Sequence, residues 1–154
     1  MPEFNLSEAV SKATEDVLST MFFTFVDEVP ADAGDQPGIE TRIAFRGHLA
    51  GSLALRCSTD AVPEMASNFL GLEADTPPSA TEQEAVMMEL ANMICGAVLS
   101  KIGSEGLFEL LPPETCRASP SAELAAMPGA HCVEHTFGVG LGALFLKFRL
   151  DDTP

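Results

Sequence analysis

The stretch TEQEAVMMELANMICGAVLSKI, residues 81–102, predicts a long helix around which the rest of the chain is organised. Thr81 and Glu84 have the spacing of a capping box, in which two side chains satisfy backbone N–H groups at the start of a helix. A long apolar run follows, with residues at helical spacing that can face a core. Gly103, directly after the stretch, is a residue type that often ends helices. We therefore expect one helix over residues 81–102.

On the N-terminal side the sequence predicts a second long helix and a pair of strands. Apolar residues recur every three or four positions over residues 5–28, which is typical of an amphipathic helix, and Asn5 can cap it. The Pro-, Gly- and Asp-rich segment 30–38 predicts an exposed loop. Residues 40–46 and 49–57 alternate between apolar and other side chains, and they predict two antiparallel strands.

A short helix is expected after these strands. Ser58 or Thr59 can cap its start, and Pro63 suits its first turn because proline lacks the N–H that a first turn leaves unbonded. Gly71 fits its end.

The C-terminal part predicts short strands and a final hairpin. Its expected elements are strands at 107–111 and 114–117 separated by Pro112 and Pro113, a loop over 118–130, and a hairpin formed by 131–137 and 141–150. Helices and alternating strands with short connections predict an α+β fold, in which a mostly antiparallel sheet is covered by the two long helices.

Length and charge restrict the function classes. With 154 residues we expect a single domain over 1–154, with an ordered core from about 5 to 150. The net charge of −15 disfavours nucleic acid and anionic membranes as partners. Residues 1–6 lack the features of a secretion signal, and no uninterrupted apolar run reaches the roughly 18 residues of a membrane span. We expect a cytoplasmic protein.

The four cysteines support the same location. Cys57, Cys95, Cys116 and Cys132 are scattered and form no CxxC pair. This pattern indicates reduced, mostly buried thiols rather than a disulfide framework.

Glu89 and Asn92 are the candidate functional residues. Within AVMMELANMICGAVL, residues 85–99, they alone carry a carboxylate or an amide, and a spacing of three places both on one helical face. Ala85 and Gly96 lie about one turn before and after this pair, and their small size leaves the face without bulky side chains. The pattern alone leaves two interpretations open: a groove where a second protein approaches closely, or a solvated Glu89 with Asn92 bonded to nearby backbone.

The segment ELANMICG, residues 89–96, resembles the ExxN signature of the CheX, CheC and FliY phosphatase family. The segment AFRGHLAGSLAL, residues 44–55, is similar to the family's strand, GxxxG and strand arrangement. LLPP, residues 110–113, resembles its downstream strand ending at proline. Together the resemblance covers most of residues 5–150, and it implies a CheX-like fold and a homodimer.

The resemblance also implies an activity in chemotaxis or another two-component signalling pathway. Family members hydrolyse the aspartyl phosphate of a CheY-type response regulator, which brings its own Mg²⁺. On this basis Asn92 positions the attacking water, Glu89 pairs with a lysine of the regulator, and no cofactor belongs to the chain itself. Phosphoryl transfer depends mainly on positioning and charge stabilisation, which an amide can supply.

Ala85 departs from the family pattern and keeps an alternative open, and the proline after the helix, Pro112 or Pro113, comes a little nearer Asn92 than in that pattern. Ala85 stands where the pattern has Asp or Ser four residues before the glutamate, and the neighbouring Glu84 points about 100° away around the helix. The alternative is a non-catalytic CheX-like module that binds a response regulator or another signalling protein. Both functions would use the same surface, in which Ala85 and Gly96 are the expected partner-binding residues.

A metal site is disfavoured. His131, Cys132 and His135 are close in sequence, but on a strand the two histidines lie about 13 Å apart, which is too far for one zinc ion. We expect hydrogen-bonded histidines on a half-buried strand instead.

Overall fold

The structure is a computed structural model that describes residues 5–26, 28–29, 37–47, 49–73, 75–102, 108–118, 131–140 and 142–151. Its elements are α1 (Leu6–Met21), β1 (Gly38–Gly47), β2 (Gly51–Ser58), α2 (Val62–Leu70), α3 (Ala80–Ile102), β3 (Phe108–Leu110), β4 (Glu114–Ala118), β5 (His131–Val139) and β6 (Gly142–Leu150). The expected loop residues 30–36 and 119–130, together with Gly103 and Leu107, lie outside the described residues.

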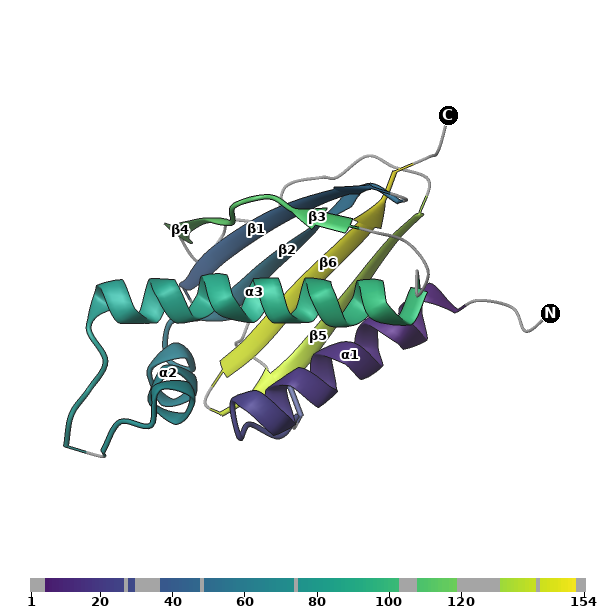
Figure 1. Cartoon of the computed structure of the whole chain (residues 1–154). Coiled ribbons are helices and arrows are strands. Elements are labelled where there is room, and N and C mark those ends of the chain that lie inside the picture. Colours follow the sequence, from purple (N-terminus) through teal and green to yellow (C-terminus); the bar gives the residue numbers. More distant parts are fainter. Residues whose placement is uncertain are drawn as a thin grey trace.

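The strands form one six-stranded sheet that the helices cover on one face (Figure 1). The strand order is β3-β1-β2-β6-β5, and β4 also pairs with β1. Each of these pairings is antiparallel. α3 crosses in front of the strands, α1 lies beside it, and α2 packs against the N-terminal part of α3. The expected α+β class, with an antiparallel sheet and long helices, is confirmed.

α3 is apolar because it forms the centre of the core. Its length and composition would allow it to cross a membrane. Its buried residues instead join a core cluster with the sheet and α1: Val86, Met87, Leu90, Ala91, Ile94, Cys95, Val98 and Leu99. Hydropathy in this helix therefore reflects packing inside a folded domain.

The predicted N-terminal helix is wrong at its C-terminal end. The expected range was 5–28, whereas α1 ends at Met21. Phe23 has φ 50°, in the left-handed region, and the N–H of Thr24 donates to the carbonyl of Leu18 over 2.9 Å. This bond satisfies a carbonyl that the helix end leaves open, so the chain turns away although its apolar spacing continues.

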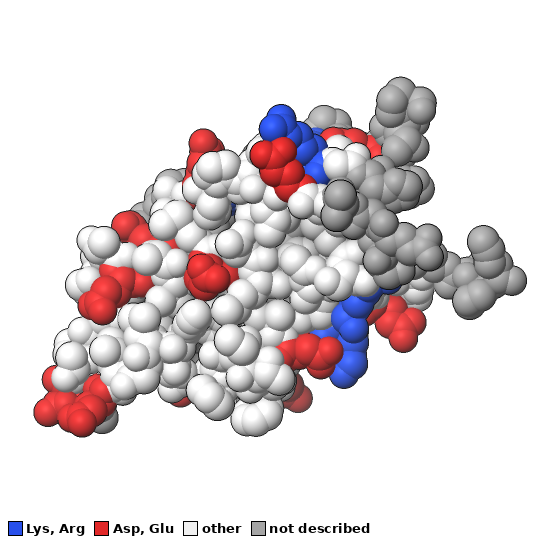
Figure 2. Space-filling view, viewed as in Figure 1, with Lys and Arg blue, Asp and Glu red and all other residues white. Residues whose placement is uncertain are grey.

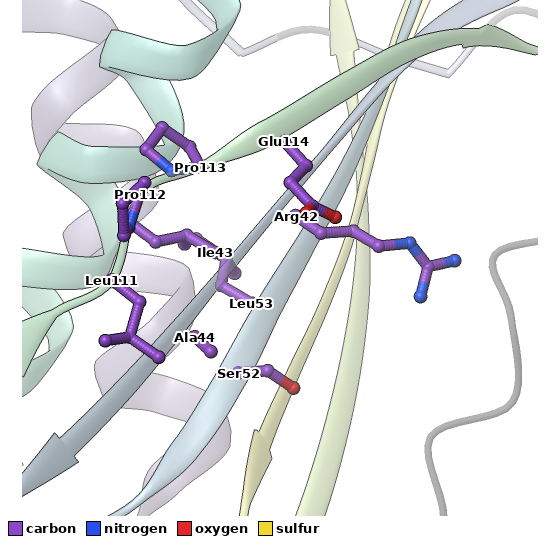
Figure 3. A pocket seen from close by; sticks show the side chains of 9 residues that line it. All are labelled: Arg42, Ile43, Ala44, Ser52, Leu53, Leu111, Pro112, Pro113 and Glu114. Atoms are coloured by element: carbon purple, nitrogen blue, oxygen red, sulfur yellow. The ribbon is translucent and has the colours of Figure 1, made fainter.

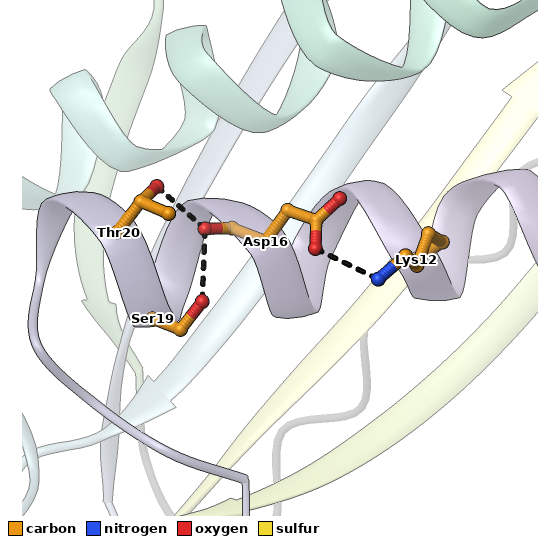
Figure 4. Close-up of polar contacts among 4 residues, drawn as sticks. All are labelled: Lys12, Asp16, Ser19 and Thr20. Carbon is orange, nitrogen blue, oxygen red and sulfur yellow. Dashed lines mark hydrogen bonds and ion pairs between the residues drawn. The ribbon is translucent and has the colours of Figure 1, made fainter.

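The outer face of α1 is occupied by its own polar contacts (Figure 4). Lys12 Nζ lies 3.1 Å from Asp16 Oδ1, one turn along the helix. The hydroxyls of Ser19 and Thr20 donate to the carbonyl of Asp16 over 3.2 and 2.6 Å. These contacts satisfy the exposed side of the helix locally.

The capping predictions were right for α1 and wrong for α3. Asn5 Oδ1 accepts the N–H of Glu8 over 3.0 Å, as expected. In α3 the capping box uses Ser79 and Glu82, whose backbone N–H groups each donate to the other's side chain, over 2.9 and 3.1 Å. The helix therefore begins before Thr81, the residue predicted to cap it.

The start of α2 also differs from the prediction. Its N-cap residue is Ala61, without a side-chain bond, while Pro63 lies in the first turn and Gly71 ends the helix with φ 69° as expected. Ser58 does not cap the helix, because its hydroxyl donates to the carbonyl of Ala143 and accepts the N–H of the same residue. The Ser58 hydroxyl, which local spacing had assigned to the helix cap, is thus bonded to a strand that is distant in sequence.

Candidate functional site

The exposed stripe of α3, which consists of Ala85, Glu89, Asn92 and Gly96, forms the candidate site. Ala85 and Glu89 are exposed, and Asn92 and Gly96 are half-buried. Glu89 and Asn92 are three residues apart, so they lie about 4.5 Å apart along the helix axis on one side. The opposite side of α3 holds the helix to the sheet, which makes this stripe a rigid platform.

Both polar side chains of the stripe are available for an external partner. Among the residues that the structure describes, neither Glu89 nor Asn92 has a hydrogen-bond or ion-pair partner. The side-chain amide of Asn92 therefore forms no hydrogen bond with the described backbone around it. A carboxylate that accepts hydrogen bonds and an amide that can both donate and accept stand together.

The small residues of the stripe leave room above it. A Cβ built on Gly96 meets nothing within 4 Å, so no neighbour in the fold requires glycine there. Figure 2 shows that the surface over the middle of α3 is largely uncharged, with isolated acidic groups and with Lys and Arg near the margins. A protein surface can approach the helix closely at this point.

The thiol nearest in sequence is no candidate nucleophile. Cys95 lies on the core side of α3, and burial raises the pKa of its thiol to about 12. At neutral pH it stays protonated, whereas the reactive form of cysteine is the thiolate. The stripe therefore offers positioning and charge, without a covalent step through this residue.

The histidine region behaves as a structural contact. Nε2 of the half-buried His135 lies 3.0 Å from the carbonyl oxygen and 3.1 Å from the hydroxyl of Ser7, which ties β5 to the start of α1. The prediction of a hydrogen-bonded histidine is confirmed for His135. Within the described part of the chain no group of three His, Cys, Asp or Glu residues is placed to hold a metal ion.

A cavity of about 470 Å³ lies away from the stripe, between β1, β2 and the segment that joins β3 to β4 (Figure 3). Leu111, Pro112 and Pro113 form one wall, and Arg42 and Glu114 contribute the charged groups. The guanidinium of Arg42 points away from the proline wall. This cavity shares no residue with the α3 stripe.

Comparison with protein families identifies the chain. The sequence model of the family described as "Chemotaxis phosphatase CheX" matches residues 39–137. This chain belongs to the CheX family. The matched range contains Glu89, Asn92 and the helix that carries them. No curated protein matches the chain by sequence.

Solved structures similar to this CheX-family chain share its fold. A chain of the CheX–CheY–BeF₃–Mg²⁺ complex from Borrelia burgdorferi is 17% identical, with a TM-score of 0.71 over 97% of this chain and 100% of that one. CheX from Vibrio vulnificus is 16% identical, with a TM-score of 0.75 over 96% and 97%. FliY from Thermotoga maritima is 14% identical, with a TM-score of 0.60 over 97% and 92%. These similarities establish the CheX-like fold.

The structure adds residues to the neighbourhood of the stripe that sequence reasoning had missed. Phe69 and Leu70, at the end of α2, border the surface next to Ala85 and Glu89. Leu70 is 44% exposed although it is large and apolar. Its position directly before Gly71 gave no sign of this contact, because helix packing is not visible in local sequence.

Proposed function

We propose that the chain dephosphorylates a phosphorylated CheY-type response regulator, with Asn92 positioning the attacking water and Glu89 pairing with a lysine of the regulator. The observation that supports this most is that, among the described residues, neither side chain has a hydrogen-bond or ion-pair partner, and both lie on the solvent-facing side of a helix within the CheX family match. The similar Borrelia burgdorferi chain was crystallised in a complex of CheX with CheY, BeF₃ and Mg²⁺, which supports a regulator as partner.

The proposed division of work follows from the chemistry of the two groups. An amide such as Asn92 can hold a water by hydrogen bonds in line with the phosphorus atom, and it needs no titration to do so. Glu89 supplies a charge that orients the regulator through its lysine. The regulator contributes the aspartyl phosphate and its Mg²⁺, so the chain needs no cofactor of its own.

Ala85 favours a second candidate function. The residue lacks the Asp or Ser side chain of the family pattern, so one polar contact to the regulator is missing from this face. A non-catalytic module would still bind the regulator through Ala85 and Gly96. The two functions use the same surface and differ in whether phosphate is released faster.

The deciding experiment measures phosphate loss from a phosphorylated CheY-type regulator of the same organism. Wild-type protein should accelerate it, and Asn92→Ala should lower kcat by about a hundredfold, because a mispositioned water loses the in-line geometry. Asn68→Ala is the matched control, since Asn68 is a half-buried asparagine on α2 outside the stripe. Binding without acceleration by the wild type would assign the non-catalytic function.

We also propose that the protein is a cytoplasmic homodimer, as the family resemblance implies. Light scattering at micromolar concentration measures the mass directly. A monomer mass would remove the dimer from the proposal without affecting the phosphatase assay.

A further inference from the structure

A hollow of about 200 Å³ lies between α2 and α3, directly beside Glu89. Its lining is formed by Phe69 and Leu70 of α2 and by Glu82, Ala85, Val86 and Glu89 of α3. Four of these six residues are apolar, and the other two are carboxylates. The hollow is therefore a mainly apolar depression with two acidic side chains in its lining.

The fold keeps this depression open. Ala85 presents only a methyl group, while α2 ends at Leu70 and the chain turns away at Gly71. The ring of Phe69 packs edge-on against Phe22, with ring centroids 4.8 Å apart, so the core fixes one wall. Because the walls are fixed and Ala85 is small, the domain's own side chains leave this space open.

Leu70 exposes apolar surface at the rim of the hollow. Leu70 leaves 44% of its surface exposed at the rim, beside the candidate site. Single exposed apolar residues are ordinary, but this one borders a cavity that shares Glu89 with the stripe. Burial of apolar surface from both sides would release water and stabilise a complex.

We infer that the hollow receives an apolar side chain of the response regulator, adjacent to the basic residue that pairs with Glu89. This inference rests on the proposed function and adds a specificity contact to it. The carboxylates of Glu82 and Glu89 favour a partner surface that carries positive charge around the apolar side chain. Glu82 Oε1 accepts the N–H of Ser79, which holds that carboxylate at the helix start.

The contact should set affinity and leave the chemical step unchanged. The hollow lies on the α2 side of Glu89, while Asn92 lies one turn further along α3 in the other direction. Regulators that present an alanine or a charged group at this point would bind poorly, even with an intact phosphorylation site. Discrimination between regulators would thus come from α2.

The test is the split between KM and kcat in Leu70→Gln, which keeps a side chain of similar size and removes its apolar character. KM for the phosphorylated regulator should rise about tenfold, the loss expected for one apolar contact, while kcat stays the same. Val29→Gln is the matched control, because Val29 is also 44% exposed and does not line the hollow.

The outcomes separate this inference from the proposed function. An active wild type with an unchanged KM in Leu70→Gln overturns the hollow contact and leaves the phosphatase standing. If the wild type binds the Mg²⁺–BeF₃-loaded regulator without catalysis, Kd replaces KM, and about tenfold weaker binding supports the contact. If the wild type neither binds nor accelerates, both proposals fall. An altered molecular mass with unchanged KM would assign the hollow to a contact between copies and overturn the inference.

Discussion

Replacing Gly96 with alanine should stabilise the domain and weaken its binding to a regulator. Gly96 lies inside α3, and an added Cβ meets nothing within 4 Å. Glycine inside a helix costs about 1 kcal/mol relative to alanine, so the free energy of unfolding should rise by about that amount. For a chain of this size the corresponding increase in Tm is about 2–4 °C.

The partner should respond in the opposite direction. A methyl group placed where two protein surfaces approach closely costs about 1–3 kcal/mol through overpacking, so the affinity for the regulator should fall. Thermal and urea unfolding measure the first effect, and titration with the Mg²⁺–BeF₃-loaded regulator measures the second. Higher stability with lower affinity would explain why the helix tolerates a destabilising glycine.

A second glycine provides the contrast. A Cβ on Gly51 would collide with the carbonyl oxygen of Arg149 and come within 2.8 Å of the Phe45 ring, so Gly51→Ala should lower Tm. A lower Tm in Gly96→Ala as well would refute the reasoning, because it would mean that the surface above the stripe is not open. Higher Tm with unchanged regulator affinity would refute the close approach of a partner at this position.

Three further predictions concern charge, thiols and the core. Arg46 Nε lies 2.7 Å from Glu109 Oε2 and lowers the pKa of that carboxyl, so this pair contributes stability above the carboxyl's unfolded pKa and loses it as pH falls. Arg46→Ala should raise the midpoint of the Glu109 titration followed by NMR; an unmoved midpoint would exclude the pairing in solution. Burial raises the pKa of the Cys57 thiol to about 12, while Cys132 is exposed, so iodoacetamide at mildly alkaline pH should label Cys132 and leave Cys57 unmodified in the folded protein, as peptide mass spectrometry would show. Leu90 is fully buried, and Leu90→Ala should reduce the free energy of unfolding by about 2–5 kcal/mol in urea titration; a change below that range would place Leu90 outside the packed core.

Local sequence patterns predicted the elements of this fold better than their ends. Alternation identified the strands and the final hairpin because each side of a strand faces a different environment. The end of α1 was missed because Phe25 continues the helical spacing, although in the structure it is 77% exposed. The left-handed turn at Phe23 decides this end, and no residue type there announces it.

The caps were missed where distant contacts compete for the same groups. Ser58 was a reasonable capping residue for α2 on spacing alone. In the fold its hydroxyl bonds to the backbone of Ala143, 85 positions further along the chain. Propensity rules describe neighbours along the chain, and they cannot include such a partner.

The candidate site was visible in sequence because it lies on one helix. Glu89 and Asn92 interrupt an apolar run, and helix geometry alone places them on one side. The hollow was not visible, because it arises between Leu70 and Ala85, on different helices. Reactive residues on one element can therefore be found from spacing, while a depression between elements needs the packed structure.

The two prolines between β3 and β4 interrupt one of the two edges of the sheet, the one opposite β5. An uninterrupted edge strand offers a row of N–H and C=O groups on which another chain can add a strand, the first step towards fibrous aggregates. Here that margin is split into pieces of three and five residues, and Pro112 and Pro113 have no N–H to donate. A cell could thus accumulate the protein to high concentration without this edge seeding insoluble material.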